Sequence, residues 1–129
     1  MSTPVRLQLS RRKGFNLQAL SKATNGLTVI NVARPGRWGN PWSIRPPGWR
    51  GSWAVLGPGA PIGGVQCGNQ EGAQLLAVKA FRTFAEAGPT QKHEPLRGKN
   101  LACWCKLGTP CHADVLIELA NRPRCEAVG

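Results

Sequence analysis

Short apolar strands and amphipathic helices alternate along the chain. Residues 5–9 (VRLQL) alternate apolar and polar side chains, and residues 27–32 (LTVINV) are rich in β-branched side chains, so both segments predict strands. Residues 71–87 place apolar side chains at helical spacing, and a Gly-Pro pair then predicts the end of a helix. Residues 101–105 (LACWC) predict a short buried strand.

A second helix is predicted after this last strand. A Gly/Pro turn (KLGTP) follows residues 101–105, and Val115, Leu116 and Leu119 then fall on one helical face. The order strand, loop, helix, strand, helix favours an α/β fold, a small Rossmann-like sandwich with a mostly parallel sheet and two main helices. Residues 27–32 and 101–105 are expected to be neighbouring parallel strands, because a crossover helix separates them.

A long Gly/Pro-rich segment separates the two halves of this pattern. The chain has 129 residues and is expected to form one domain, residues 1–129. Residues 35–68 hold nine Gly and six Pro, which interrupt every periodicity, so they predict a long loop. The tail, residues 122–129, is expected to fray.

Charge is distributed unevenly along the chain. The formal net charge is +11, and residues 1–70 hold nine Lys or Arg and no acidic residue. This half is expected to project a positive field that attracts nucleotides or nucleic acid, although the same charge also serves solubility alone. There is no run of about 18 apolar residues and no secretion signal at the N-terminus, so we expect no membrane partner and a cytoplasmic location.

The candidate chemistry gathers between residues 101 and 121, which hold three of the five cysteines, one of the two histidines and the only aspartate. An odd count and a C-x-C pair favour reduced thiols or ligands over disulfides. A helix start at Cys111 favours a thiolate, His112 could serve as its base, and Asp114 could cap the helix or orient the imidazole. These three are candidate catalytic residues, and Cys111 is predicted to be the most reactive thiol.

The loop after residues 27–32 carries candidate ligand-binding residues. Arg34 and Arg37 offer bidentate contacts to phosphate, and Gly39 allows close approach of the backbone. Asn40 could contact a base or ribose edge, and Trp38 could stack on a ring. The alternative is that Trp38 belongs to the core and Asn40 to a turn.

A zinc site is a second hypothesis for the cysteine-rich segment. Cys103, Cys105, Cys111 and His112 supply the four ligands that a structural zinc ion needs. Their spacing differs from the C-x2-C pairs of common zinc fingers, and Cys67 is an alternative fourth ligand.

A third hypothesis is a basic binding module without catalysis. Trp42, Trp49 and Trp53 lie near Arg45 and Arg50, a mixture that suits stacking and backbone neutralisation on single-stranded nucleic acid. The same surface could instead bind a host protein, or the tryptophans could pin the long loop to the core. His93, in a polar turn, is expected to be exposed.

Three motifs resemble a family of small proteins from bacteriophages and prophage-bearing bacteria that is catalogued as a domain of unknown function. The motifs are a basic R-x-K-G turn, W-G-N-P, and C-W-C followed by C-H-x-D at a helix start. They correspond here to Arg11, Lys13 and Gly14; Trp38, Gly39, Asn40 and Pro41; and Cys103, Trp104, Cys105, Cys111, His112 and Asp114. The segment from Ser43 to Gly68 departs from the family pattern, and the resemblance implies no activity.

Taken together, the residues predict a protein that binds a phosphate-bearing ligand, a nucleotide, nucleoside or nucleic acid, at the loops after the two main strands. Ligands collect at the carboxyl ends of parallel strands, and both motif loops leave such ends. Arg11 and Lys13 are expected to contact the phosphate. Glycosidic-bond or nucleotide-transfer chemistry suits this pocket, whereas a single carboxylate disfavours both two-carboxylate hydrolysis and a two-magnesium nuclease.

Overall fold

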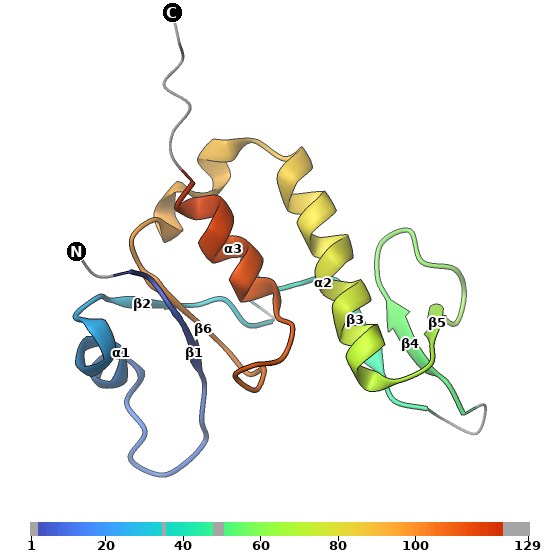
Figure 1. The fold of residues 1–129 in the computed structure, drawn as a ribbon, viewed down its shortest axis with the longest axis horizontal. Coiled ribbons are helices and arrows are strands. Elements are labelled where there is room, and N and C mark those ends of the chain that lie inside the picture. Colours follow the sequence, from blue (N-terminus) through green and yellow to red (C-terminus); the bar gives the residue numbers. More distant parts are fainter. Residues whose placement is uncertain (1–2, 35, 48–50, 123–129) are drawn as a thin grey trace, which may run out of the picture.

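The computed structural model describes residues 3–34, 36–47 and 51–122, which form two small sheets, three α-helices and one 3-10 helix (Figure 1). In chain order the elements are β1 (Arg6–Gln8), α1 (Leu17–Asn25), β2 (Val29–Asn31), β3 (Ser43–Arg45), β4 (Trp53–Leu56), β5 (Val65–Cys67), α2 (Gln70–Ala87), the 3-10 helix η1 (Thr90–Leu96), β6 (Asn100–Cys103) and α3 (His112–Ala120).

The first sheet is parallel and holds the candidate chemistry. Its strand order is β1-β6-β2, with both outer strands parallel to the central β6. Arg6 of β1 and Ile30 of β2 both lie opposite Leu101. The prediction that residues 27–32 and 101–105 form neighbouring parallel strands is therefore confirmed. All three strands end at the same edge, where their loops can meet.

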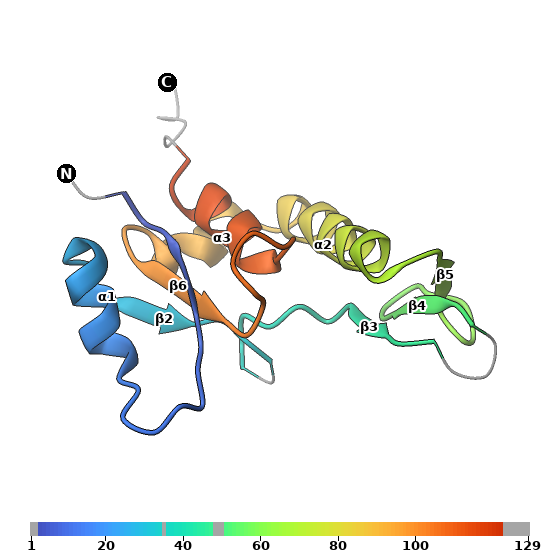
Figure 2. The same cartoon turned by 60° about the horizontal axis from the view of Figure 1, so that its bottom comes forward.

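Helices cover both faces of this parallel sheet. Leu101 and Cys103 face a core that includes Val115 and Leu116 of α3, and Figure 2 shows α3 lying over this side of the sheet. Ala102 points to the other face, as strand alternation requires, where a second cluster receives Leu17 of α1. The start of α3 is thus packed directly above the end of β6.

A buried amide anchors the start of β6. The Asn100 side chain is fully buried, and its Oδ1 accepts from the backbone N–H of Val5 and from Asn25 Nδ2. Its Nδ2 donates to Ser21 Oγ and to Asn25 Oδ1. Because every polar atom of the amide is satisfied, Asn100 joins β1 and α1 to β6 and sets the position of the strand that carries Cys103.

A second sheet corrects the prediction of a loop over residues 35–68. The strands β3, β4 and β5 lie within this segment and pair antiparallel in that order. Val55 of β4 packs against Ala73 and Ala77 in the first half of α2. The second sheet thus lies beside α2 and apart from the parallel sheet (Figure 1). The sequence pattern did not reveal these strands, because Gly and Pro interrupt the hydrophobic periodicity but do not prevent short antiparallel pairings. Trp49 and Arg50 lie outside the described residues.

The expected α/β class is confirmed in its coarse form, a mixed fold with one parallel sheet. The number of helices is corrected: α1, which starts at the side-chain cap of Asn16 and ends at Gly26 (φ 80°), joins the two predicted helices within the described residues. The polar turn predicted around His93 is the 3-10 helix η1, and His93 is buried rather than exposed.

Among the described residues, no helix is both long enough and apolar enough to span a bilayer. In the predicted tail, the segment from residue 123 onward, Cys125 included, lies outside the described residues.

Candidate metal centre and adjoining cavity

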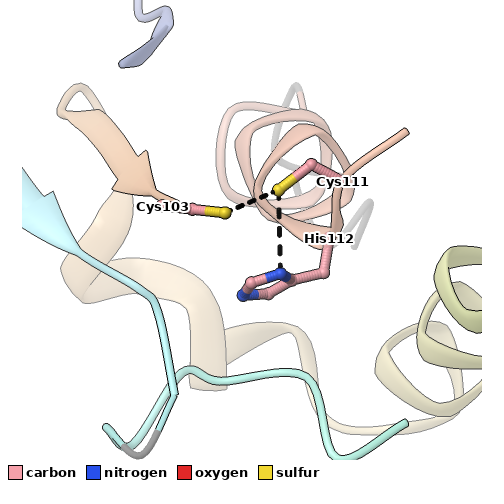
Figure 3. Close-up of side chains that lie close together, drawn as sticks. All are labelled: Cys103, Cys111 and His112. Carbon is pink, nitrogen blue, oxygen red and sulfur yellow. Dashed lines mark hydrogen bonds between the residues drawn. The ribbon is translucent and has the colours of Figure 1, made fainter. Parts of the chain in front are cut away.

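Two thiols and an imidazole converge where β6 ends and α3 begins. Cys103 is the last residue of β6, Cys111 caps the N-terminus of α3, and His112 is its first residue. The Sγ atoms of Cys103 and Cys111 lie 2.9 Å apart, and Cys111 Sγ lies 3.8 Å from Nδ1 of His112 (Figure 3). Their three ligand atoms all lie within 4.8 Å of one another, so these buried side chains can hold a metal ion.

The orientation of His112 is fixed from the opposite side of its ring. Nε2 lies 2.8 Å from the carbonyl oxygen of Val32, just beyond the end of β2. Since a carbonyl only accepts, Nε2 carries a proton toward Val32, and in the neutral ring the lone pair of Nδ1 then faces Cys111. Phe81 packs edge-on against the imidazole, with ring centroids 5.3 Å apart. Metal-binding histidines are typically held in this way, by a backbone carbonyl on the second nitrogen.

Cys105 lies beside this cluster and is only half-buried. Its backbone N–H donates to the Cys103 sulfur at 3.3 Å, and its thiol interacts with those of Cys103 and Cys111. It does not belong to the set whose ligand atoms all lie within 4.8 Å of one another. Of the four ligands predicted from sequence, the structure therefore brings three into one site and places the fourth at its border.

Among the three thiols, that of Cys111 is the one favoured to carry a negative charge. Hydrogen bonds from the thiols of Cys103 and Cys105 lower the pKa of Cys111, with smaller contributions from His112 and the N–H of Ala113. The contacts that Cys105 makes with the thiols of Cys103 and Cys111 raise the pKa of Cys105. The first thiolate of the cluster is thus Cys111, at a helix N-terminus.

The Cys111 sulfur is nonetheless enclosed. The residue is 1% exposed, which does not favour the prediction that it is the most reactive thiol in the chain. A buried thiolate beside a second thiol and an imidazole suits a metal ligand better than a free nucleophile.

Asp114 does not orient the imidazole. Its Oδ2 lies 3.5 Å from Nη1 of Arg6 on β1, and its side chain is 55% exposed. The expected role of Asp114 toward His112 is therefore corrected: Val32 holds the ring, and Cys111 caps the helix. Asp114 lies in the first turn of α3, and its carboxylate faces β1 instead.

A cavity of about 220 Å³ adjoins the cluster. Its lining comes from the loop after β2, from β3, from α2 and from the β6–α3 turn. The lining residues are Ala33, Arg34, Asn40, Trp42, Ser43, Ile44, Gln74, Ala77, Val78, Cys103, Trp104, Cys105, Pro110, Cys111 and His112. The two motif loops therefore meet in one cavity, as their positions after parallel strands predicted.

The W-G-N-P loop divides its side chains between two places. Arg34 and Asn40 line the main cavity, whereas Arg37, Trp38 and Gly39 line a smaller cavity of about 40 Å³ beside His93. Arg37 stacks on Trp38 with its guanidinium carbon 4.6 Å from the ring centroid. The predicted ligand-binding set of this loop is thus not brought together as a whole.

Asn40 has the structural role of a turn residue. Its Oδ1 accepts from the N–H of Trp42 at 2.8 Å, and its Nδ2 donates to the Ala77 carbonyl of α2 at 3.3 Å. The side chain is buried and joins the loop to the helix, which confirms the turn alternative. A ligand in the cavity would meet an amide that is already engaged.

The basic turn after β1 reaches the rim of the main cavity. The guanidinium carbon of Arg11 lies 4.7 Å from the ring centroid of Trp104, which follows β6 and lines the cavity. Lys13 is exposed on the same turn. The parallel pairing of β1 with β6 explains this meeting, because both strands end at one edge.

Sequence reasoning nominated Trp42 only for the basic binding module, and it did not nominate Arg6. Trp42 lines the cavity and donates from Nε1 to the Pro58 carbonyl, and Arg6 lies buried next to Asp114. Trp42 directly follows W-G-N-P, a signal that could have placed it in this cavity, whereas Arg6 occupies a polar position of the alternating strand pattern and carried no such signal.

The chain belongs to the family described as "Domain of unknown function (DUF4326)", which matches residues 15–122. An uncharacterized 12.4 kDa protein in the nrdA-td intergenic region of Enterobacteria phage T4 is 41% identical over 61 residues, which are 46% of this chain and 56% of that protein. The match thus covers little more than half of the phage relative. No solved structure matches the chain. The predicted membership of a phage-associated family of unknown function is confirmed.

Proposed function

We propose that this member of the family is a zinc-stabilised domain that binds a nucleotide, or one nucleotide unit of a nucleic acid, in the main cavity. One observation carries the proposal: the cavity that Cys103, Cys111 and His112 line is also lined by Arg34 and by Trp104. A metal centre, a cation for phosphate and an aromatic ring for a base thus border one space. The parallel sheet would then serve as a reduced Rossmann-like core, with its ligand at the carboxyl edge.

Zinc is the metal that suits these ligands. Thiolate and imidazole ligands in a tetrahedral arrangement select zinc, with bonds of about 2.3 Å to sulfur and 2.0 to 2.1 Å to nitrogen. Such bonds place sulfur and nitrogen about 3.6 Å apart, close to the 3.8 Å between Cys111 Sγ and His112 Nδ1. The sulfurs of Cys103 and Cys111 would have to move apart by about 0.9 Å, a small side-chain rotation. Cys105 would complete the tetrahedron.

The charge of the cavity favours an anionic ligand. Among the described residues, its lining includes the exposed Arg34 and no Asp or Glu, and Arg11 reaches its rim on Trp104. A volume of about 220 Å³ is below the roughly 300 to 1,000 Å³ of pockets that take drug-sized ligands. We therefore propose that a base or nucleoside enters the cavity, while the phosphate stays outside, on Arg34 and the basic turn.

The proposal concerns binding rather than the glycosidic-bond or nucleotide-transfer chemistry considered from sequence. Asp114, the carboxylate nominated for catalysis, does not line the cavity. The alternative of a basic module for a host protein shares the same surface and is separated from nucleotide binding by experiment. A relative encoded by a bacteriophage supports action in the cytoplasm of an infected host cell.

The test begins with elemental analysis of the purified protein, where we expect about one zinc per chain. Tryptophan fluorescence is then titrated with nucleoside monophosphates and with short single-stranded oligonucleotides, at low and high salt. Arg34→Gln should weaken binding by roughly 10- to 100-fold, because a hydrogen bond to a charged group contributes about 1.5 to 3 kcal/mol. Trp104→Ala should cost about 1 to 3 kcal/mol of stacking. Lys22→Gln, exposed on α1, is the matched control.

Two results would contradict the proposal. A protein without metal whose melting temperature ignores a chelator would remove the zinc centre, since a structural ion contributes to folding directly. No binding of nucleotides or oligonucleotides at low salt, or binding that ignores ionic strength, would remove the phosphate-bearing ligand. The host-protein alternative would then take its place.

A further inference from the structure

Among the described residues, Arg6 places a buried guanidinium next to the thiol cluster, and the function proposed above gives it no role. Its side chain is 8% exposed on β1. Nη2 donates to the Lys106 carbonyl at 3.3 Å, in the turn between Cys105 and Cys111. Nη1 is buried and, among the described residues, has no hydrogen-bond partner. A buried donor without a partner destabilises the folded state, so this N–H is expected to have a partner when the protein is functional.

The neighbours of the guanidinium identify that partner. Asp114 Oδ2 lies 3.5 Å from Nη1, which is beyond good hydrogen-bond distance. A second side chain that interacts with the guanidinium is that of Cys111, at the start of α3, which packs on β1. A thiol is a weak acceptor, whereas a thiolate is an anion and accepts strongly. The guanidinium is therefore matched to Cys111 in its thiolate form, the form that binds metal.

The charge of the proposed metal centre agrees with this match. A zinc ion held by the thiolates of Cys103, Cys105 and Cys111 and by neutral His112 would carry one net negative charge. A buried net charge is costly unless a counter-charge lies beside it. Arg6 supplies one positive charge at this place in the fold.

We infer that Arg6 is a positioning residue of the zinc centre: it donates from Nη1 to the Cys111 thiolate, and Asp114 holds it there from the solvent side. The inference rests on the proposed zinc site. It also gives the aspartate of C-H-x-D a role, because a spacing of three residues places Asp114 next to Cys111 on α3, facing β1.

The experiment measures zinc affinity by competition with a chromophoric chelator, at one fixed neutral pH and salt concentration. Arg6→Gln is expected to weaken zinc binding by about 10- to 100-fold, the usual effect of losing a residue that supports a ligand. Arg6→Lys keeps the charge and should restore part of the affinity, and Asp114→Asn should cause a smaller loss. Arg45→Gln, exposed on β3, is the matched control and should bind as the unmodified protein does.

Cobalt substitution separates this role from a general loss of stability. The sulfur-to-cobalt charge-transfer band depends on the electron density of the thiolates, so Arg6→Gln should shift it to lower energy. A variant that only destabilises the fold would leave the band of its folded fraction in place. If Arg6→Gln does not fold, Arg6→Lys and Asp114→Asn provide the same two measurements.

The outcomes distinguish the two proposals. If the unmodified protein binds no zinc, the metal centre itself is wrong and the role of Arg6 is wrong with it. If it binds zinc, and the Arg6 and Asp114 variants keep both the affinity and the cobalt band, the centre stands and the role of Arg6 is overturned.

Discussion

Removing the imidazole of His112 should cost much more stability with zinc present than without it. The side chain has two roles in the structure, and only one of them depends on a bound metal ion. Nε2 satisfies the buried Val32 carbonyl and the ring packs on Phe81, whether or not an ion is bound. Nδ1 is the candidate ligand atom in the cluster with Cys103 and Cys111.

The magnitude follows from these contacts. With a chelator present, His112→Ala leaves the Val32 carbonyl without a hydrogen bond, which costs about 1 to 3 kcal/mol of stability. It also removes an edge-to-face contact with Phe81 that contributes about 0.5 to 1.5 kcal/mol. The expected loss is therefore about 2 to 4 kcal/mol. Free zinc at a thousand times its dissociation constant stabilises the folded state by about 4 kcal/mol. Losing one ligand forfeits most of that, so the loss in zinc should approach 6 to 8 kcal/mol.

The assay is urea unfolding of both proteins, once with a chelator and once with excess zinc. His93→Ala is the matched control, because His93 is also buried, at 5% exposed, but lies outside the thiol cluster. Its cost should be the same under the two conditions. An equal cost of His112→Ala with and without zinc would refute the assignment of Nδ1 as a ligand, whatever the size of that cost.

Two further predictions concern pH and the W-G-N-P loop. Burial, and then the charge of Lys92, lower the pKa of His93 from 6.5 in the folded protein. As the pH falls below about 6.5, the unfolded chain therefore binds a proton before the folded protein does. The free energy of unfolding should then decline by at most about 1.4 kcal/mol per pH unit. His93→Gln should flatten this decline in urea unfolding with a chelator present, and an unchanged slope would show that His93 is not its source. A Cβ at Gly39 would lie 2.6 Å from Arg34 Cγ and 3.0 Å from its Cα, so Gly39→Ala should cost about 1 to 3 kcal/mol of stability and weaken nucleotide binding. The control is Gly68→Ala, where the methyl group meets nothing within 4 Å; equal affinities of the two variants would contradict the link between this loop and Arg34.

Local patterns in the sequence were sufficient to predict much of the parallel part of the fold. Period-two and β-branched runs predicted β1, β2 and β6, and helical spacing predicted α2 and α3, because these signals lie within a few residues of one another. The crossover rule then predicted that β2 and β6 are parallel neighbours. Placing Cys103 at a strand end and Cys111 with His112 at a helix start was enough to predict that they meet.

The second sheet and the 3-10 helix were decided by tertiary structure. The strands of residues 43–45, 53–56 and 65–67 are short and are separated by Gly and Pro, so they have little local signal and depend on pairing with each other and packing on α2. His93 is buried because η1 packs with α3, which a polar local sequence does not reveal.

The roles of individual site residues were also decided by contacts between distant parts of the chain. His112 is oriented by a carbonyl 80 residues earlier, and the carboxylate of Asp114 lies 3.5 Å from an arginine on the first strand. Asn40 is held by a carbonyl of α2, 37 residues later. The sequence alone determined which chemical groups gather at the sheet edge. Only the tertiary structure determined which group each one contacts, because side-chain partners depend on packing between elements and not on spacing along the chain.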